Sequence, residues 1–93
     1  MNLSINHPTD RPNFTEVEVG DITIWFSYRT AVGFAAPGWG RVVRKNDWGP
    51  TTGKHLNEID RGDKGSRVDG EAFGIMLEEA YAGRMPVSEL VDQ

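Results

Sequence analysis

The sequence predicts a small α+β domain, in which an antiparallel sheet of three or four strands is covered by one short and one longer α-helix. Three observations support this fold class. Apolar and polar residues alternate through much of the first half of the chain, between glycine-rich turns. Apolar residues recur at helical spacing in the second half. The chain has 93 residues, which is enough for a single hydrophobic core.

The composition fits a globular domain, with 38% hydrophobic and 26% charged residues. The absence of cysteine excludes disulfides, thiolate metal sites and a thiol nucleophile. The chain does not begin like a signal peptide, and no apolar stretch approaches the roughly 18 residues that a membrane span needs. We therefore predict a cytoplasmic protein with no membrane partner and no cofactor.

The strands are expected in the first half of the chain. Residues 1–13 contain prolines and no usable periodicity, which predicts a flexible N-terminal arm or an edge extension outside a single domain at residues 14–93. Residues 14–19 and 22–28 alternate around a Gly20-Asp21 turn, as in a β-hairpin. Two further extended runs follow, at residues 31–36 and 41–44.

The helices are expected in the second half. A short helix is predicted over residues 52–60, with Thr51 or Thr52 as its N-cap. A longer helix near 70–82 is predicted by the spacing of its apolar residues, which are Phe73, Met76, Leu77, Ala80 and Tyr81. Asp69 is its expected N-cap and Gly83 its C′ residue, and Pro86 begins a last short segment, residues 87–91.

Residues 48–57 (Trp-Gly-Pro-Thr-Thr-Gly-Lys-His-Leu-Asn) form the most informative stretch. A glycine and a lysine that open a helix can present N–H groups and a cation to an anion. The spacing excludes a Walker-type loop, because only three residues separate Gly49 from Gly53 and His55 follows Lys54. A weaker anion site therefore stays open, and so does the alternative that the threonines cap the helix and Lys54 is solvated.

The same stretch carries a family resemblance. The run Phe26-Ser27-Tyr28-x-Thr30-x-Val32-x-Phe34, followed by Val42-Val43-Arg44-x-Asn46 and then by a Trp-x-x-Thr-Thr-x-Lys-His-Leu-Asn core at residues 48–57, resembles a family of small uncharacterised proteins encoded by phages, prophages and plasmids. The similarity covers about residues 22–82. It implies a mobile-element origin and expression in a bacterial host cytoplasm, and it assigns no catalytic residues.

Charge is distributed unevenly along the chain. The net charge is −4, but residues 41–67 are basic and residues 68–93 are strongly acidic. The basic residues of the middle segment, interleaved with Trp39 and Trp48, are Arg41, Arg44, Lys45, Lys54, Arg61, Lys64 and Arg67. In such a segment the basic side chains can bind phosphates and a tryptophan can stack on a base. A negative net charge is nevertheless unusual for a nucleic-acid-binding domain. An ordinary solvated charge pattern is the alternative.

From these observations we predict a non-catalytic phage or mobile-element accessory protein that binds a host component or self-associates. Nucleic-acid or nucleotide binding through residues 41–67 is the alternative, and a small enzyme is a second alternative for which no residue pair can be nominated. Host protein, nucleic acid and a second copy therefore all stay open as partners. His7 and His55 are too far apart in the sequence to suggest a metal site. The candidate binding residues are Arg44, Trp48, Thr51, Thr52, Lys54, His55 and Asn57.

Overall fold

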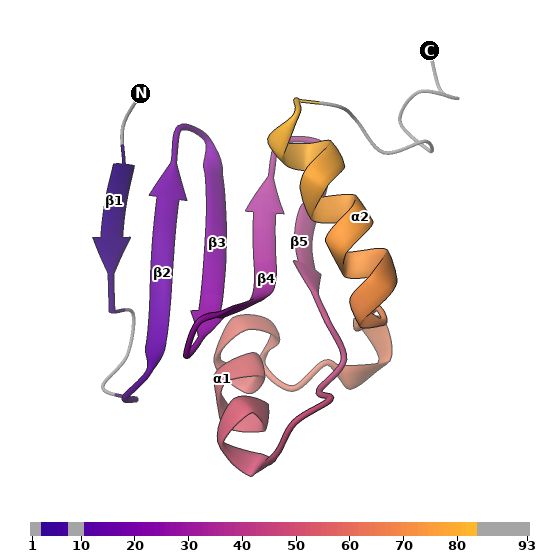
Figure 1. Cartoon of the computed structure of the whole chain (residues 1–93). Helices are drawn as coiled ribbons and strands as arrows, with labels where there is room; N and C mark the ends of the chain where they lie inside the picture. Colours follow the sequence, from indigo (N-terminus) through magenta and orange to yellow (C-terminus); the bar gives the residue numbers. More distant parts are fainter. Residues whose placement is uncertain (1–2, 8–10, 84–93) are drawn as a thin grey trace.

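Five antiparallel strands form one sheet in which neighbours in sequence are neighbours in space (Figure 1). The computed structural model describes residues 3–7 and 11–83. The strands are β1 (Leu3–Asn6), β2 (Phe14–Val19), β3 (Ile22–Ser27), β4 (Thr30–Ala36) and β5 (Gly40–Val43). The α+β class is therefore confirmed, and the number of strands is five instead of the three or four predicted.

The additional strand is β1, which pairs with β2 at the edge of the sheet. Leu3 lies opposite Val19, and Ile5 lies opposite Val17. This strand belongs to residues 1–13, for which the sequence left a flexible arm and an edge extension open. Its four residues contain only two apolar positions, so alternation is too short there to identify a strand.

The helices α1 (Pro50–Asp60) and α2 (Gly70–Tyr81) cover opposite faces of the sheet and are connected through a short 3-10 helix, η1 (Lys64–Ser66). Paired residues on neighbouring strands share a face, and successive residues alternate between faces. The core beneath α1 consists of Phe14, Val32, Val43, Leu56 and Ile59, with Trp25 packed against it. The core beneath α2 consists of Phe34, Val42, Phe73 and Ala80. The partly buried residues packed against it are Ile24, Ala31, Ala36, Trp39, Val68, Met76 and Leu77.

A β-bulge adapts the sheet to α1. The register between β3 and β4 shifts between Trp25 and Phe26, so that Val32 and Gly33 both lie on the α1 side. A Cβ atom at Gly33 would lie 3.1 Å from Cδ1 of Ile59. The absence of a side chain at this position therefore lets α1 approach the sheet closely.

The helix ends agree with the sequence in one case and differ in the other. The Asp69 carboxylate accepts a hydrogen bond from the N–H of Ala72 at 2.8 Å, which confirms it as the N-cap of α2, and Gly83 follows the C-cap with φ 82°. The N-cap of α1 is Gly49, so the prediction of Thr51 or Thr52 was wrong. Pro50 takes the first helical position, where its fixed φ starts the helix two residues earlier than expected. The segment at residues 87–91 lies outside the described residues.

Candidate anion-binding site

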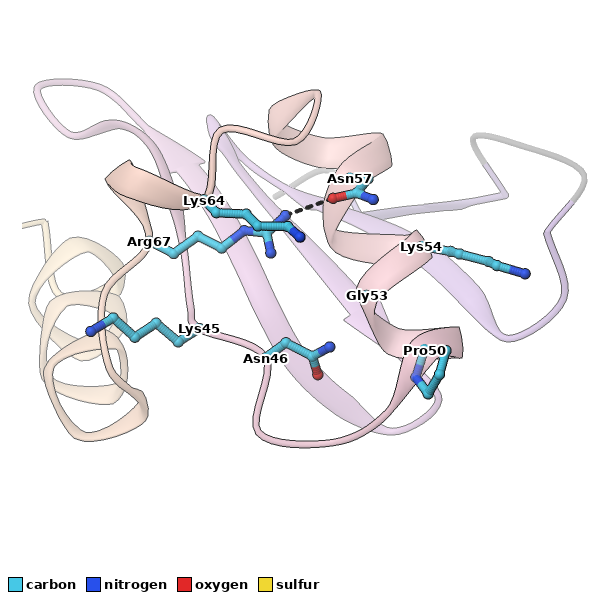
Figure 2. A pocket seen from close by; sticks show the side chains of 8 residues that line it. All are labelled: Lys45, Asn46, Pro50, Gly53, Lys54, Asn57, Lys64 and Arg67. Carbon is cyan, nitrogen blue, oxygen red and sulfur yellow. Dashed lines mark hydrogen bonds between the residues drawn. The ribbon is translucent and has the colours of Figure 1, made fainter.

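A basin of about 450 Å³ opens between α1, the loop that precedes it and η1 (Figure 2). Its lining residues are Lys45, Asn46, Pro50, Gly53, Lys54, Asn57, Lys64 and Arg67. The three lysines are all the lysines of the chain. Residues that are up to 22 positions apart in the sequence therefore place their positive charges around one hollow, which we call the basic basin.

Three carboxylates near the basic basin pair with arginines and not with its lysines. Arg44 pairs with Asp47 at 3.0 Å and Arg67 pairs with Asp60 at 2.7 Å. Glu58, on the outer side of α1, pairs with Arg11 at 2.8 Å. Among the described residues, no ion pair involves a lysine.

Arg67 and Asp60 form the rigid wall of the basic basin. The Arg67 side chain is buried, and its guanidinium donates to both carboxylate oxygens of Asp60, at 2.7 and 3.0 Å. Burial raises the pKa of the Asp60 carboxyl, but hydrogen bonds from Arg67 and from the N–H of Gly62 outweigh this effect, so the pKa lies below its usual value. Arg67 also donates to Oδ1 of Asn57 at 2.9 Å, which leaves the Asn57 amide N–H groups as the donors available to a ligand.

Asn46 shapes the loop before α1. Its Oδ1 accepts from the N–H of Trp48 at 2.9 Å, and its Nδ2 donates to the carbonyl of Gly49 at 3.1 Å. These local bonds fix residues 46–49 as a turn. The loop has the basic basin on one side and exposes the indole of Trp48.

The exposed indole borders a second hollow, of about 230 Å³, which we call the aromatic cavity. Its lining residues are Ser27, Tyr28, Thr30, Val32, Trp48 and Thr52. Tyr28 and Trp48 are 55% and 48% exposed. The guanidinium carbon of Arg44 lies 4.6 Å from the centre of the Trp48 ring, a cation–π contact that restrains the indole.

A buried hydrogen-bond network lies beneath the aromatic cavity. The Ser27 hydroxyl lies 2.7 Å from Nδ1 of His55 and 3.1 Å from the hydroxyl of Thr52, and Nε2 of His55 lies 3.1 Å from the carbonyl of Pro12. A carbonyl only accepts, so Nε2 carries the proton and Nδ1 accepts from Ser27. His55 is 1% exposed and stacks on Phe14, and burial lowers its pKa below the usual value.

This network does not have the form of an open catalytic site. The distance from Ser27 to His55 would suit a nucleophile and its base. However, the Ser27 side chain is 3% exposed, and both ring nitrogens of His55 are engaged. Among residues 3–7 and 11–83, no group of three or more His, Cys, Asp or Glu residues is arranged to hold a metal ion. The chemistry that the exposed groups support is anion binding.

The structure distributes the predicted site residues over these features. Lys54 and Asn57 line the basic basin, whereas Trp48 and Thr52 line the aromatic cavity. Arg44 lies against Trp48, and Thr51 is exposed in the first turn of α1. His55 is buried and accessible to no ligand in this arrangement.

Other lining residues were absent from the predicted set. Lys45, Lys64 and Arg67 were recognised only as part of the basic segment, and the sequence gives no signal that they meet Lys54. Tyr28 was missed because the alternation placed it at the end of a strand over residues 22–28. In the structure β3 ends at Ser27, and Tyr28 lies in a two-residue turn before β4, where glycine or asparagine is typical.

The fold and the two hollows define a small α+β domain with a basic, solvent-open site beside exposed aromatic rings. The chain belongs to a family of unknown function (DUF8033), whose family model matches residues 1–74. This agrees with the resemblance to an uncharacterised family, and the matched part includes every residue of the basic basin and of the aromatic cavity. Comparisons with curated proteins and with solved structures found no match. In the described residues, no helix is long and apolar enough to cross a membrane.

Proposed function

We propose that this protein is a non-catalytic binding module whose basic basin takes up the phosphate backbone of a nucleic acid. The observation that carries the proposal is the gathering of all three lysines around one hollow, with no lysine–carboxylate ion pair among residues 3–7 and 11–83. Ammonium groups without an internal partner release counterions when they contact phosphates, which is the main source of affinity for nucleic acids. The mobile-element origin and the host cytoplasm implied by the family resemblance are part of this proposal.

The spread of the lysines favours a polyanion over a single phosphate. In Figure 2, Lys45 and Lys54 extend toward opposite sides of the basic basin, and Lys64 lies across its middle beside Asn57. One phosphate is too small to contact ammonium groups that diverge in this way. A chain of phosphates can engage them in turn, and the Asn57 amide adds a hydrogen-bond donor between them.

The negative net charge does not oppose this function. The exposed carboxylates of α2, such as Glu71 and Glu78, lie on a helix that covers the other face of the sheet from α1. Charges separated by more than about 10 Å of salt solution are largely screened from one another. Carboxylates on that face, such as Glu78, therefore affect a phosphate in the basic basin less than the lysines that line the basin.

The proposal is tested by the binding of a fluorescently labelled DNA strand of about 16 nucleotides, followed by anisotropy. Three lysine contacts predict that log K falls with log salt with a slope of about −2, which is about a 20-fold loss between about 50 and 200 mM salt. The triple variant Lys45→Gln, Lys54→Gln, Lys64→Gln should lose this affinity. The control Arg61→Asn removes one exposed charge outside the basin, at a position with φ 56° that asparagine tolerates, and should bind like the wild type.

Two outcomes would overturn the proposal. The first is the absence of saturable binding by the wild type at about 50 mM salt. The second is equal affinity of the wild type and the triple variant, with both proteins shown to be folded by circular dichroism.

The edge of the sheet supports a second candidate function, protein association. Leu3 and Ile5 of β1 are 64% and 63% exposed, and they extend the apolar face formed by Val17 and Val19. Among residues 3–6 there is no proline or charged side chain to block the pairing of this edge with another strand. We propose that a second copy of the chain pairs antiparallel through β1, and that a host protein segment is the alternative strand.

Sedimentation equilibrium distinguishes these partners. The wild type should dimerise and Ile5→Lys should remain monomeric, because a lysine on each copy adds charge to the shared face. A wild type that is monomeric throughout the accessible concentration range would refute self-association, and the host-protein alternative would then be tested by strand-addition peptides.

A further inference from the structure

We infer that the aromatic cavity between Tyr28 and Trp48 holds one unpaired nucleobase, so that the nucleic acid bound by the basic basin is single-stranded. This inference rests on the proposed function, because it assumes that phosphates occupy the basic basin. It identifies the ligand class more narrowly than a patch of lysines can, since positive charge alone does not distinguish a duplex from a single strand.

The first argument is the chemistry of the cavity wall. Tyr28 and Trp48 are the only aromatic side chains among its six lining residues, and both are about half exposed. Exposed aromatic rings beside a positive groove are the typical stacking platforms for single-stranded nucleic acids. The cavity volume of about 230 Å³ is below the roughly 300 Å³ at which pockets for drug-sized ligands begin, and a single flat ring suits this size.

The second argument is backbone strain at Tyr28. This residue has φ 59°, in the left-handed region where a bulky side chain is an outlier. Glycine or asparagine would occupy the turn between β3 and β4 at lower cost. Strain of this kind is concentrated at functional sites, where a particular side chain is required. The tyrosine ring at the mouth of the aromatic cavity provides such a reason.

The third argument is the position of the cavity relative to the basic basin. The cavity is lined by Trp48 and Thr52, and the basin by Asn46, Pro50 and Gly53. The two hollows thus alternate along a single turn-and-helix segment, residues 46–53. A single strand whose phosphates follow the lysines can turn one base toward the indole, whereas the bases of a duplex are stacked inside it.

The cavity also provides polar groups for the edge of a base. The Thr30 side chain is exposed, and its hydroxyl has no hydrogen-bond partner among the described residues. The hydroxyls of Ser27 and Thr52 bond to each other beneath the rings. Because few directional donors face the cavity, we expect a tolerant site that accepts several bases, as stacking generally does.

The test compares three labelled DNA probes of about 16 nucleotides. One is a single strand of thymidines, one is an abasic strand with the same number of phosphates, and one is a duplex. The wild type should bind the thymidine strand at least about fivefold more tightly than the abasic strand, which is the lower end of the value of one stacked base. The duplex should bind more weakly than the thymidine strand.

Two substitutions probe the rings. Trp48→Ala and Tyr28→Asn should each remove most of the preference for the thymidine strand and leave abasic binding unchanged. Tyr28→Asn relieves the backbone strain, so it should be at least as stable as the wild type, which separates loss of binding from loss of folding. Tyr81→Ala, which removes an exposed tyrosine from α2, is the matched control and should behave like the wild type.

The outcomes separate this inference from the proposed function. Equal affinity for the thymidine and abasic strands, with a normal salt slope, would overturn the aromatic cavity as a base site and retain the basic basin. A preference for the thymidine strand that survives both substitutions would also overturn it. Failure to bind any of the three probes would refute the proposed function itself.

Discussion

Removing the Ser27 hydroxyl tests whether the network beneath the aromatic cavity holds α1 on the sheet. In Ser27→Ala, Nδ1 of His55 loses its donor at 2.7 Å and the Thr52 hydroxyl loses its partner at 3.1 Å. His55 is 1% exposed, so its Nδ1 is left without a partner in the protein interior. A buried polar group left without a partner costs about 1 to 3 kcal/mol. We therefore expect the free energy of unfolding to fall by about 2 kcal/mol.

Urea unfolding followed by tryptophan fluorescence measures this loss. With an m-value of about 1 to 1.5 kcal/mol/M, toward the low end for small proteins, the urea midpoint of Ser27→Ala should fall by about 1.5 M. The matched control is Thr51→Ala, which alters an exposed side chain in the same turn of α1 as Thr52. It should change the free energy of unfolding by less than about 0.5 kcal/mol. If Ser27→Ala unfolds at the same urea concentration as Thr51→Ala, the network contributes nothing and the reasoning is refuted.

Three further predictions concern the pKa shifts and the helix cap. Burial lowers the pKa of His55 in the folded state, so near and below the ordinary histidine pKa of about 6.5 the unfolded chain binds more protons than the folded protein. This contribution to stability should be complete above that pH, and the urea midpoint should decrease between about pH 7 and 5.5. A flat profile would contradict the pKa shift. Asp60→Asn removes the carboxylate from the buried Arg67 and should destabilise by about 3 to 5 kcal/mol in urea unfolding, so a loss below about 1 kcal/mol would show that Arg67 finds another partner. Asp69→Ala should cost about 1 kcal/mol through the lost N-cap, measurable in the same assay, with Asp69→Asn retaining most of the stability as the control.

The sequence was a reliable guide where a local pattern determined the structure. The apolar spacing from Phe73 to Tyr81 and the Asp69 cap predicted α2 to within one residue. The hairpin of β2 and β3 followed from alternation around Gly20. These features depend on residues that are close in the chain, so periodicity and turn chemistry suffice to identify them.

Features that depend on contacts between distant residues were missed. β1 becomes a strand because β2 offers it an edge, not because its own four residues have a strong preference. The bulge that turns Val32 and Gly33 toward α1 likewise arises from the pairing of β3 with β4. It places two consecutive residues of β4 on one face of the sheet, which the alternation pattern of a single strand does not predict.

The candidate site illustrates the same limit. Lys54 and Asn57 were predicted because they belong to the motif at residues 48–57, but Lys45 and Lys64 join them only through the folding of the loops on either side of α1. His55 was included because it is next to Lys54 in sequence. On a helix, adjacent residues point about 100° apart, so Lys54 faces solvent while His55 faces the core.

The two helices on opposite faces also give the molecule an electrical polarity that its net charge conceals. The lysines gather around α1, the loop that precedes it and η1, whereas α2 and its N-cap carry exposed carboxylates, including Asp69, Glu71 and Glu78. A molecule polarised in this way experiences a torque in the field of a polyanion and turns its lysine side forward before contact. The acidic helix is repelled by the polyanion and so helps to orient the molecule during association. Added salt should therefore slow the association rate more than it speeds dissociation.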